Sequence, residues 1–117
     1  MIYYGGIAKN KYVIADYTAF DGDFRVKFQK IVNSLPADGN IKATKLDEYT
    51  FYVKQNTDGY AFGCMVLAFV GSDVPNTFIE SLQKRVHQRI EDEVEGDSGS
   101  TARDLTKLIQ ELIVILW

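Results

Sequence analysis

The sequence of 117 residues predicts a single α+β domain, an antiparallel sheet with helices on both faces. Three observations lead to this prediction. Two strand-like runs precede the first helix-like run, and three more follow it through short connections that favour antiparallel pairing. The last of these runs is apolar on both of its faces, as expected for a central strand that is covered on each side. Two helix-like runs then follow, so the predicted order is β-β-α-β-β-β-α-α.

The first two strands are predicted at residues 2–9 and 12–18. Both runs are rich in β-branched and aromatic residues. They are joined at Asn10-Lys11, a spacing that suits a two-residue hairpin in which Asn10 takes a positive φ.

The first helix is predicted at residues 23–35. Asp21 or Asp23 can accept hydrogen bonds from the free amides of its first turn. Pro36 disfavours helical dihedral angles at Leu35, so the helix should end there. Apolar residues recur at helical spacing on one face, which is therefore expected to be buried. These residues are Phe24, Phe28, Ile31, Val32 and Leu35.

Three more strands are predicted at residues 41–46, 49–55 and 60–70. The stretch 56–59, Asn-Thr-Asp-Gly, is a strong turn signal before the last of them. Along 60–70 both alternating sets of residues are apolar, which places this strand centrally. Along 49–55 one of the two sets is more polar, which places that strand nearer an edge.

The second helix has Pro75 in its first turn, with Ser72 or Asp73 as the cap. An acidic connector follows at 91–100, flexible in composition over 94–100, and a third helix is predicted at 101–117. The buried stripe of the second helix is Phe78, Ile79, Leu82, Val86 and Ile90. That of the third helix is Leu105, Leu108, Ile109, Leu112 and Ile113. The third helix either covers the sheet as part of the core or lies in a groove as a regulatory segment.

Composition and charge exclude several kinds of protein. The net charge is −3. Basic residues cluster only at Lys84, Arg85 and Arg89, and we interpret this cluster as a solvated helix face. Nucleic acid is therefore not an expected partner. The single cysteine, Cys64, lies in an apolar run and is expected to be a buried small hydrophobe. No secretory leader and no apolar run long enough to span a membrane is visible, which predicts a cytoplasmic domain.

The sequence contains no pattern of catalytic, metal-binding or cofactor-binding residues. His87 is the only histidine, lies off the apolar stripe of its helix and is expected at the surface or boundary. Glycine-rich phosphate loops are absent. We therefore predict that the chain is not an enzyme and binds no metal or organic cofactor, because a small enzyme on this scaffold would need a convergent polar cluster.

Six segments resemble, in their order and spacing, the longin domain, which is the N-terminal regulatory domain of certain vesicle SNAREs and of SNARE-like trafficking proteins. The segments are Ile2-Tyr-Tyr-Gly-Gly-Ile-Ala8, Ile14-Ala-Asp-Tyr-Thr18, Asp21-Gly-Asp-Phe24, Leu35-Pro36, Tyr49-Thr-Phe-Tyr-Val53 and residues 75–86. The resemblance covers nearly the whole chain. It implies the profilin-like longin fold, a five-stranded antiparallel sheet with the first helix on one face and the other two on the opposite face. Gly5, Gly6 and Gly63 would then lie where a helix approaches the sheet closely.

The resemblance also implies a function. Longin domains are non-catalytic protein-interaction domains that regulate vesicle trafficking and membrane fusion at the cytosolic face of endomembranes or vesicles. The resemblance implies that this chain binds its own downstream segment or a trafficking partner, such as a SNARE, an adaptor or a GTPase-system protein. It also implies that the chain meets a membrane only indirectly, through sequence not present here. The alternative is a longin-like subunit of a tethering, adaptor or small-GTPase-regulating complex.

Carried over by position, the partner-binding groove lies between the helix at 23–35 and the strand at 41–46. The residues expected to form it are Val26, Lys27, Lys30, Ile41, Lys42, Ala43 and Thr44. The alternative is that the apolar residues of this helix are used only for the core.

Overall fold

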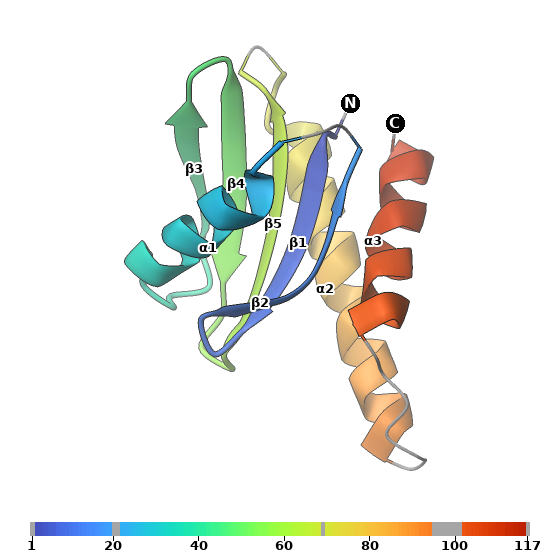
Figure 1. The fold of residues 1–117 in the computed structure, drawn as a ribbon. Coiled ribbons are helices and arrows are strands. Elements are labelled where there is room, and N and C mark those ends of the chain that lie inside the picture. Colours follow the sequence, from blue (N-terminus) through green and yellow to red (C-terminus); the bar gives the residue numbers. More distant parts are fainter. Residues whose placement is uncertain (1, 20–21, 69, 95–101, 117) are drawn as a thin grey trace.

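The computed structural model describes residues 2–19, 22–68, 70–94 and 102–116. Its five strands form one antiparallel sheet in the order β2-β1-β5-β4-β3 (Figure 1). The strands are β1 (Tyr4–Lys9), β2 (Tyr12–Thr18), β3 (Ile41–Leu46), β4 (Tyr49–Gln55) and β5 (Tyr60–Leu67). The helices are α1 (Phe24–Ser34), α2 (Asp73–Val94) and α3 (Ala102–Leu116). The predicted element order is confirmed, with β5 in the centre and β4 next to the edge strand β3.

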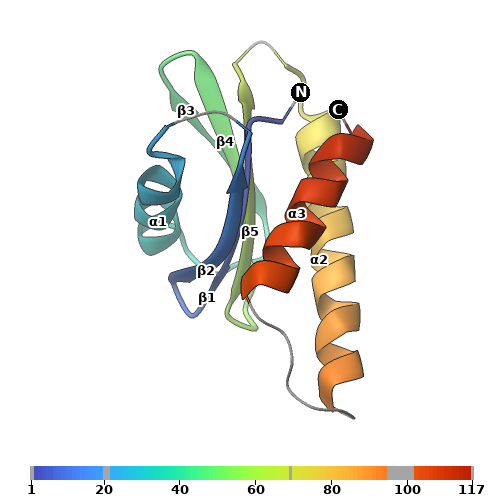
Figure 2. The same cartoon turned by 45° about the vertical axis from the view of Figure 1, so that its right-hand side comes forward.

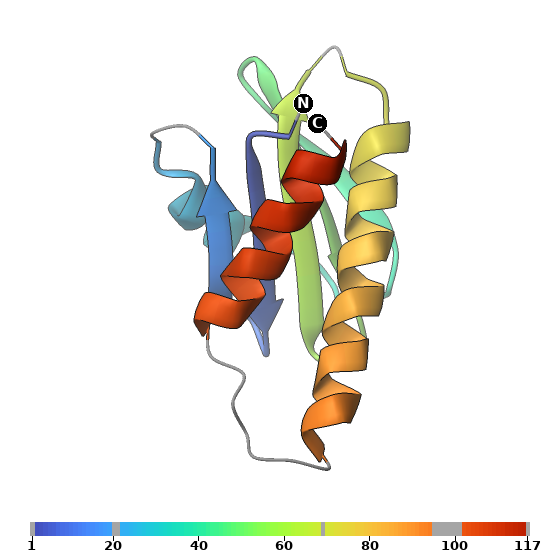
Figure 3. The ribbon, with the colours of Figure 1, turned by 90° about the vertical axis from the view of Figure 1, so that its right-hand side faces the viewer.

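The three helices divide between the two faces of the sheet. Helix α1 covers one face and α2 and α3 cover the other (Figures 2 and 3). We call the apolar cluster beneath α1 the one-helix core and the cluster beneath α2 and α3 the two-helix core. The predicted stripe of α3 is buried in the two-helix core, so this helix packs on the sheet as part of the core and not in a groove.

The two cores take opposite faces of the same strands. The one-helix core consists of Tyr4, Ala8, Phe24, Phe28, Ile31, Val32, Phe51, Val53, Ala61 and Met65. The two-helix core includes Ile7, Phe62, Cys64 and Val66 from the sheet with Phe78, Leu82, Ile109 and Ile113 from the helices. Residues 61–66 of β5 are all buried, as the apolar pattern of both faces predicts.

The hairpin between β1 and β2 has the predicted two-residue turn. Asn10 has φ 50° and Lys11 has φ 72°, so both turn residues are in the left-handed region, as in a type I′ turn. The register of the pair shifts between Ile7 and Ala8, which marks a β-bulge.

Helix α1 begins and ends close to the predicted residues, but its cap differs. Asp23 is the N-cap residue, yet its carboxylate makes no capping hydrogen bond. Its φ of −88° and ψ of 44° lie outside the extended conformation that aims a cap side chain at the first amides, so the predicted cap by Asp23 is wrong. Asp21 lies outside the described residues. Leu35 has ψ 144°, as expected for the residue before Pro36.

Glycines allow α1 and the sheet to approach each other closely. A Cβ added to Gly6 would lie 2.6 Å from the Phe28 ring, and one added to Gly63 would lie 2.5 Å from it. On the other face, a Cβ on Gly5 would lie 2.6 Å from Ile109. The role predicted for these three glycines is confirmed.

Three predicted boundaries are wrong. Strand β1 begins at Tyr4 rather than at residue 2. Strand β5 ends at Leu67 rather than at 70, because the chain turns there and the Val70 amide donates to the Leu67 carbonyl. Helix α2 continues to Val94, so the first four residues of the predicted connector at 91–100 are helical. Phe69 and residues 95–101 lie outside the described ranges, as does the side chain of Ile90.

A candidate partner-binding groove

A hollow of about 450 Å³ lies between α1 and the end of β3. Ile31 and Leu46, which belong to or pack against the one-helix core, supply its apolar surface. Lysines and one aspartate supply its polar rim. The lining residues are Lys27, Lys30 and Ile31 from α1 with Lys45, Leu46 and Asp47 from the β3–β4 hairpin. We call this hollow the α1 groove.

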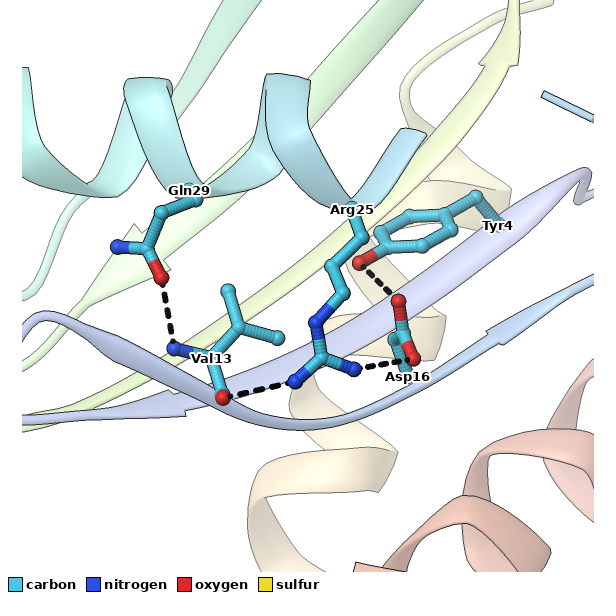
Figure 4. Close-up of polar contacts among 5 residues, drawn as sticks. All are labelled: Tyr4, Val13, Asp16, Arg25 and Gln29. Atoms are coloured by element: carbon cyan, nitrogen blue, oxygen red, sulfur yellow. Dashed lines mark hydrogen bonds and ion pairs between the residues drawn. The ribbon is translucent and has the colours of Figure 1, made fainter. Parts of the chain in front are cut away.

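The opposite flank of α1 is tied to the edge strand β2 (Figure 4). Arg25 donates through Nη2 to the Val13 carbonyl at 3.1 Å, and the Gln29 side-chain oxygen accepts from the Val13 amide at 3.0 Å. Gln29 also donates to the Lys11 carbonyl. These bonds satisfy backbone groups of the edge strand that would otherwise be free to pair with a strand of another molecule. One flank of α1 is therefore closed and the flank beside β3 is open.

A buried tyrosine joins the same polar cluster. The Tyr4 hydroxyl donates to Asp16 Oδ2 at 3.0 Å, and Arg25 Nη1 lies 3.0 Å from Asp16 Oδ1 (Figure 4). Burial, and then the neighbouring Asp16 carboxylate, raise the pKa of Tyr4 well above its ordinary value. Tyr4 is therefore a neutral donor that fixes the Asp16 carboxylate, which in turn fixes Arg25.

The C-terminal end of α1 is held by the side chains of Lys11, in the β1–β2 turn, and Gln55, in β4. Lys11 Nζ donates to the Leu35 carbonyl at 2.9 Å and to the Val32 carbonyl at 3.3 Å. Gln55 Nε2 donates to the same two carbonyls, at 2.6 Å and 3.3 Å. The last carbonyl groups of a helix have no partner within the helix, so these bonds satisfy them. Helix α1 is thus anchored at its end and along one flank, which gives the α1 groove a rigid wall.

The structure brings together only part of the predicted groove. Lys27 and Lys30 line it. Val26 is 52% exposed and does not line it. Lys42 and Thr44 do lie on the α1 side of β3, because their register partners Val53 and Phe51 belong to the one-helix core. They do not line the hollow, and Lys42 instead forms an ion pair with Asp38 at 3.0 Å.

The other two predicted residues face away from α1. Ile41 packs against the two-helix core, and Ala43 is paired with Tyr52, which also packs there. The physical reason is the two-residue period of a strand, since four consecutive residues cannot share one face. Leu46 was missed by the sequence prediction. The alternation could have found it, because Leu46 follows Lys42 and Thr44 on the α1 side of β3 and is apolar.

The remaining reactive side chains are packed or paired. Cys64 is fully buried, and burial raises the pKa of its thiol. His87 is a half-buried residue within α2, with Nε2 3.3 Å from Asp58 Oδ2 and its ring edge-on to Tyr60. Among the described residues there is no group of three or more His, Cys, Asp or Glu side chains that could hold a metal ion. No helix in the described ranges is long and apolar enough to cross a membrane.

The chain is similar to curated plant proteins. It is 27% identical over 101 residues to the putative vesicle-associated membrane protein 726 of Arabidopsis thaliana, covering 86% of this chain and 43% of that protein. It is 28% identical over 85 residues to vesicle-associated membrane protein 711 of the same plant, covering 72% and 38%. The chain thus spans less than half the length of these relatives. No model of a known protein family matches it.

The structure is similar to that of a yeast protein. The solved structure of the R-SNARE Nyv1p, a longin domain protein, superposes with a TM-score of 0.59. The match covers 99% of this chain and 88% of the other, at 13% sequence identity.

Proposed function

We propose, from the longin fold of this chain and its likeness to vesicle-associated membrane proteins, that it is a non-catalytic protein-interaction domain acting in vesicle trafficking. The observation that carries the proposal is the α1 groove, an open hollow beside a helix whose other flank is anchored. A shallow groove of this kind accepts a short helical or extended segment that buries one apolar face. We place the domain at the cytosolic face of vesicles or endomembranes.

The occupant of the groove follows from its lining. Ile31 and Leu46 offer a small apolar surface, so the occupant places one or two apolar side chains there. Lys27, Lys30 and Lys45 border that surface, with Asp47 as the single acidic neighbour. Charge complementarity therefore favours an occupant that carries acidic residues beside its apolar ones.

Two occupants compete for this groove in the proposal. One is a segment of the same protein that follows the domain, and the other is a separate trafficking protein. Because the groove holds only one of them at a time, the fraction of domains that are free to bind the separate protein depends on the relative affinities of the two occupants. The domain would then act as a switch that regulates membrane fusion.

A second candidate function is that of a subunit in a tethering, adaptor or small-GTPase-regulating complex. The favouring observation is an exposed apolar pair on the outer side of α3, where Val114 is 67% exposed and Ile115 65% exposed. A subunit of a permanent assembly uses such a surface for contact with its neighbour. Size-exclusion chromatography with light scattering separates this candidate from the first, because it predicts a stable oligomer that Val114→Asp dissociates.

Site-specific photo-crosslinking in cells tests the groove. A photoreactive amino acid at position 30, which lines the α1 groove, should crosslink to a trafficking protein or to a downstream part of the same chain. The matched control is position 84, an exposed lysine on α2, the helix that lies on the sheet face opposite α1. With the photoreactive residue at position 45 instead, the double charge-reversal variant Lys27→Glu/Lys30→Glu should lose the crosslinks. Identical crosslinks from positions 30 and 84, or none to any trafficking protein, would contradict the proposal.

A further inference from the structure

A second hollow, of about 380 Å³, lies between α2 and α3 on the face of the molecule opposite α1. Arg85, Gln88 and Arg89 of α2 form its polar side, and Leu108 of α3 forms its apolar side. Leu108 is only 8% exposed because it belongs to the two-helix core, so the base of this hollow is fixed by the packing of α3. We call it the arginine hollow.

Among the described residues, no acidic side chain forms an ion pair with Arg85 or Arg89. They lie four residues apart on one helix, a spacing that places both guanidinium groups on the same side. The ion pairs of the described residues are Arg25–Asp16, Lys42–Asp38 and His87–Asp58, and none involves these two side chains. Like charges at this spacing repel each other, and partly buried charges are usually paired. Lys84, beside them in sequence, is exposed and does not line the hollow.

We propose that the arginine hollow binds a phosphate monoester. Two guanidinium groups present their N–H donors in planar forks that match the oxygens of a phosphate, and the Gln88 amide adds a further donor. A phosphate monoester carries between one and two negative charges at neutral pH, which balances two arginines better than a single carboxylate does. The net charge of the chain is −3, so its overall electrostatics do not favour anions and binding depends on this local site.

The proposal is independent of the α1 groove, because no residue lines both hollows. It gives the domain a means to recognise a phosphorylated small molecule or the phosphorylated headgroup of a membrane lipid while a protein occupies the groove. The two sources share the same chemistry at the arginines and differ only in whether the phosphate is free or held at a surface.

The test is titration of the whole chain with inorganic phosphate, followed by amide NMR, and sedimentation with phosphatidylcholine vesicles that contain phosphatidylinositol 4-phosphate. Phosphate should shift the amide resonances of residues 85–89 and 108. Arg85→Gln/Arg89→Gln should weaken binding about tenfold or more, since charge-assisted hydrogen bonds are lost. The matched control Lys84→Gln/Lys107→Gln removes the same charge from two exposed positions and should bind as the wild type does.

Each outcome decides the proposal. Binding to vesicles together with phosphate identifies a lipid headgroup site, and binding to phosphate without vesicle binding identifies a soluble ligand. Arg85→Lys/Arg89→Lys keeps the charge and should still bind more weakly than the wild type, and it serves if the glutamine variant fails to fold. The assignment would be overturned if the arginine and lysine variants lost affinity equally, or if the wild type bound neither inorganic phosphate nor the vesicles.

Discussion

The ring of Phe28 lies directly over the backbone of Gly63, where a Cβ would come within 2.5 Å of the ring carbon Cε1. Gly6 is the register partner of Gly63 in the neighbouring strand, and a Cβ added there would lie 2.6 Å from the same ring. Two strands at the middle of the sheet therefore lack side chains where Phe28 of α1 packs on them. This contact fixes how deep α1 sits, and hence how far the α1 groove opens beside it.

Gly63→Ala should destabilise the domain by about 1–3 kcal/mol, the usual cost of adding a methyl group to a filled core. The measurement is the midpoint of urea unfolding. Gly71→Ala is the matched control, since a Cβ there meets no atom within 4 Å. Equal midpoints for the two variants would show that Phe28 moves aside at no cost and that the depth of α1 is not set by these glycines.

The elements of this fold were predictable because apolar spacing reports burial directly. The stripes of α1 and α3 and the two apolar faces of β5 required nothing beyond periodicity. The end of β5 could not be predicted in this way, since Val70 continues the apolar pattern after the strand has turned at Leu67. The pattern records which side chains are apolar, whereas the turn is made by a backbone hydrogen bond from the Val70 amide to the Leu67 carbonyl, which side-chain polarity does not report.

The candidate groove was predictable only in its location. Lys27 and Lys30 were expected there because they lie off the apolar stripe of α1, and they do line the hollow. The anchors Arg25 and Gln55 were missed, because their partners are backbone groups of segments that are distant in sequence. A polar residue that anchors a helix and one that only meets water look the same in a single sequence.

Val66→Asp should prevent folding. Val66 is fully buried in the two-helix core, and an unpaired carboxylate there would cost several kcal/mol, comparable to the whole stability of a small domain. The measurement is circular dichroism with thermal melting. Ala68→Asp is the control, because Ala68 follows β5 and is exposed, so this variant should melt cooperatively near the wild-type temperature. A folded Val66→Asp protein would contradict the described position of β5.

Ile109→Asp and Val114→Asp distinguish the two sides of α3. Ile109 is fully buried against the sheet, whereas Val114 is 67% exposed. The first variant should unfold the domain or expose α3 to protease, and the second should leave the melting temperature within a few degrees of the wild type. Similar behaviour of the two variants would show that α3 is not a fixed part of the core. Ending the chain at Ser98 should likewise cause aggregation or a much lower melting temperature.

Tyr4→Phe should change how stability depends on alkaline pH. Burial and the Asp16 carboxylate raise the pKa of Tyr4 in the folded state above its unfolded value of about 10. Above that pH the unfolded chain releases the proton and the folded protein keeps it, so the unfolded state binds fewer protons and the free energy of unfolding falls as pH rises. The contribution is therefore fully present below about pH 10 and is lost above it, with a slope of at most about 1.4 kcal/mol per pH unit.

At neutral pH the same variant should be less stable by about 1 kcal/mol, because it loses the hydrogen bond to Asp16 while Arg25 keeps its ion pair. The stability difference between the two proteins should then shrink between about pH 9 and about pH 11 as wild-type Tyr4 begins to oppose folding. Burial also raises the pKa of Cys64, but that thiol is present in both proteins and cancels in the difference. Tyr12→Phe alters a side chain that is 73% exposed and should keep the wild-type slope in urea unfolding across this range. A Tyr4→Phe curve parallel to the wild type would mean that the hydroxyl reaches water and that the Tyr4–Asp16–Arg25 cluster is open.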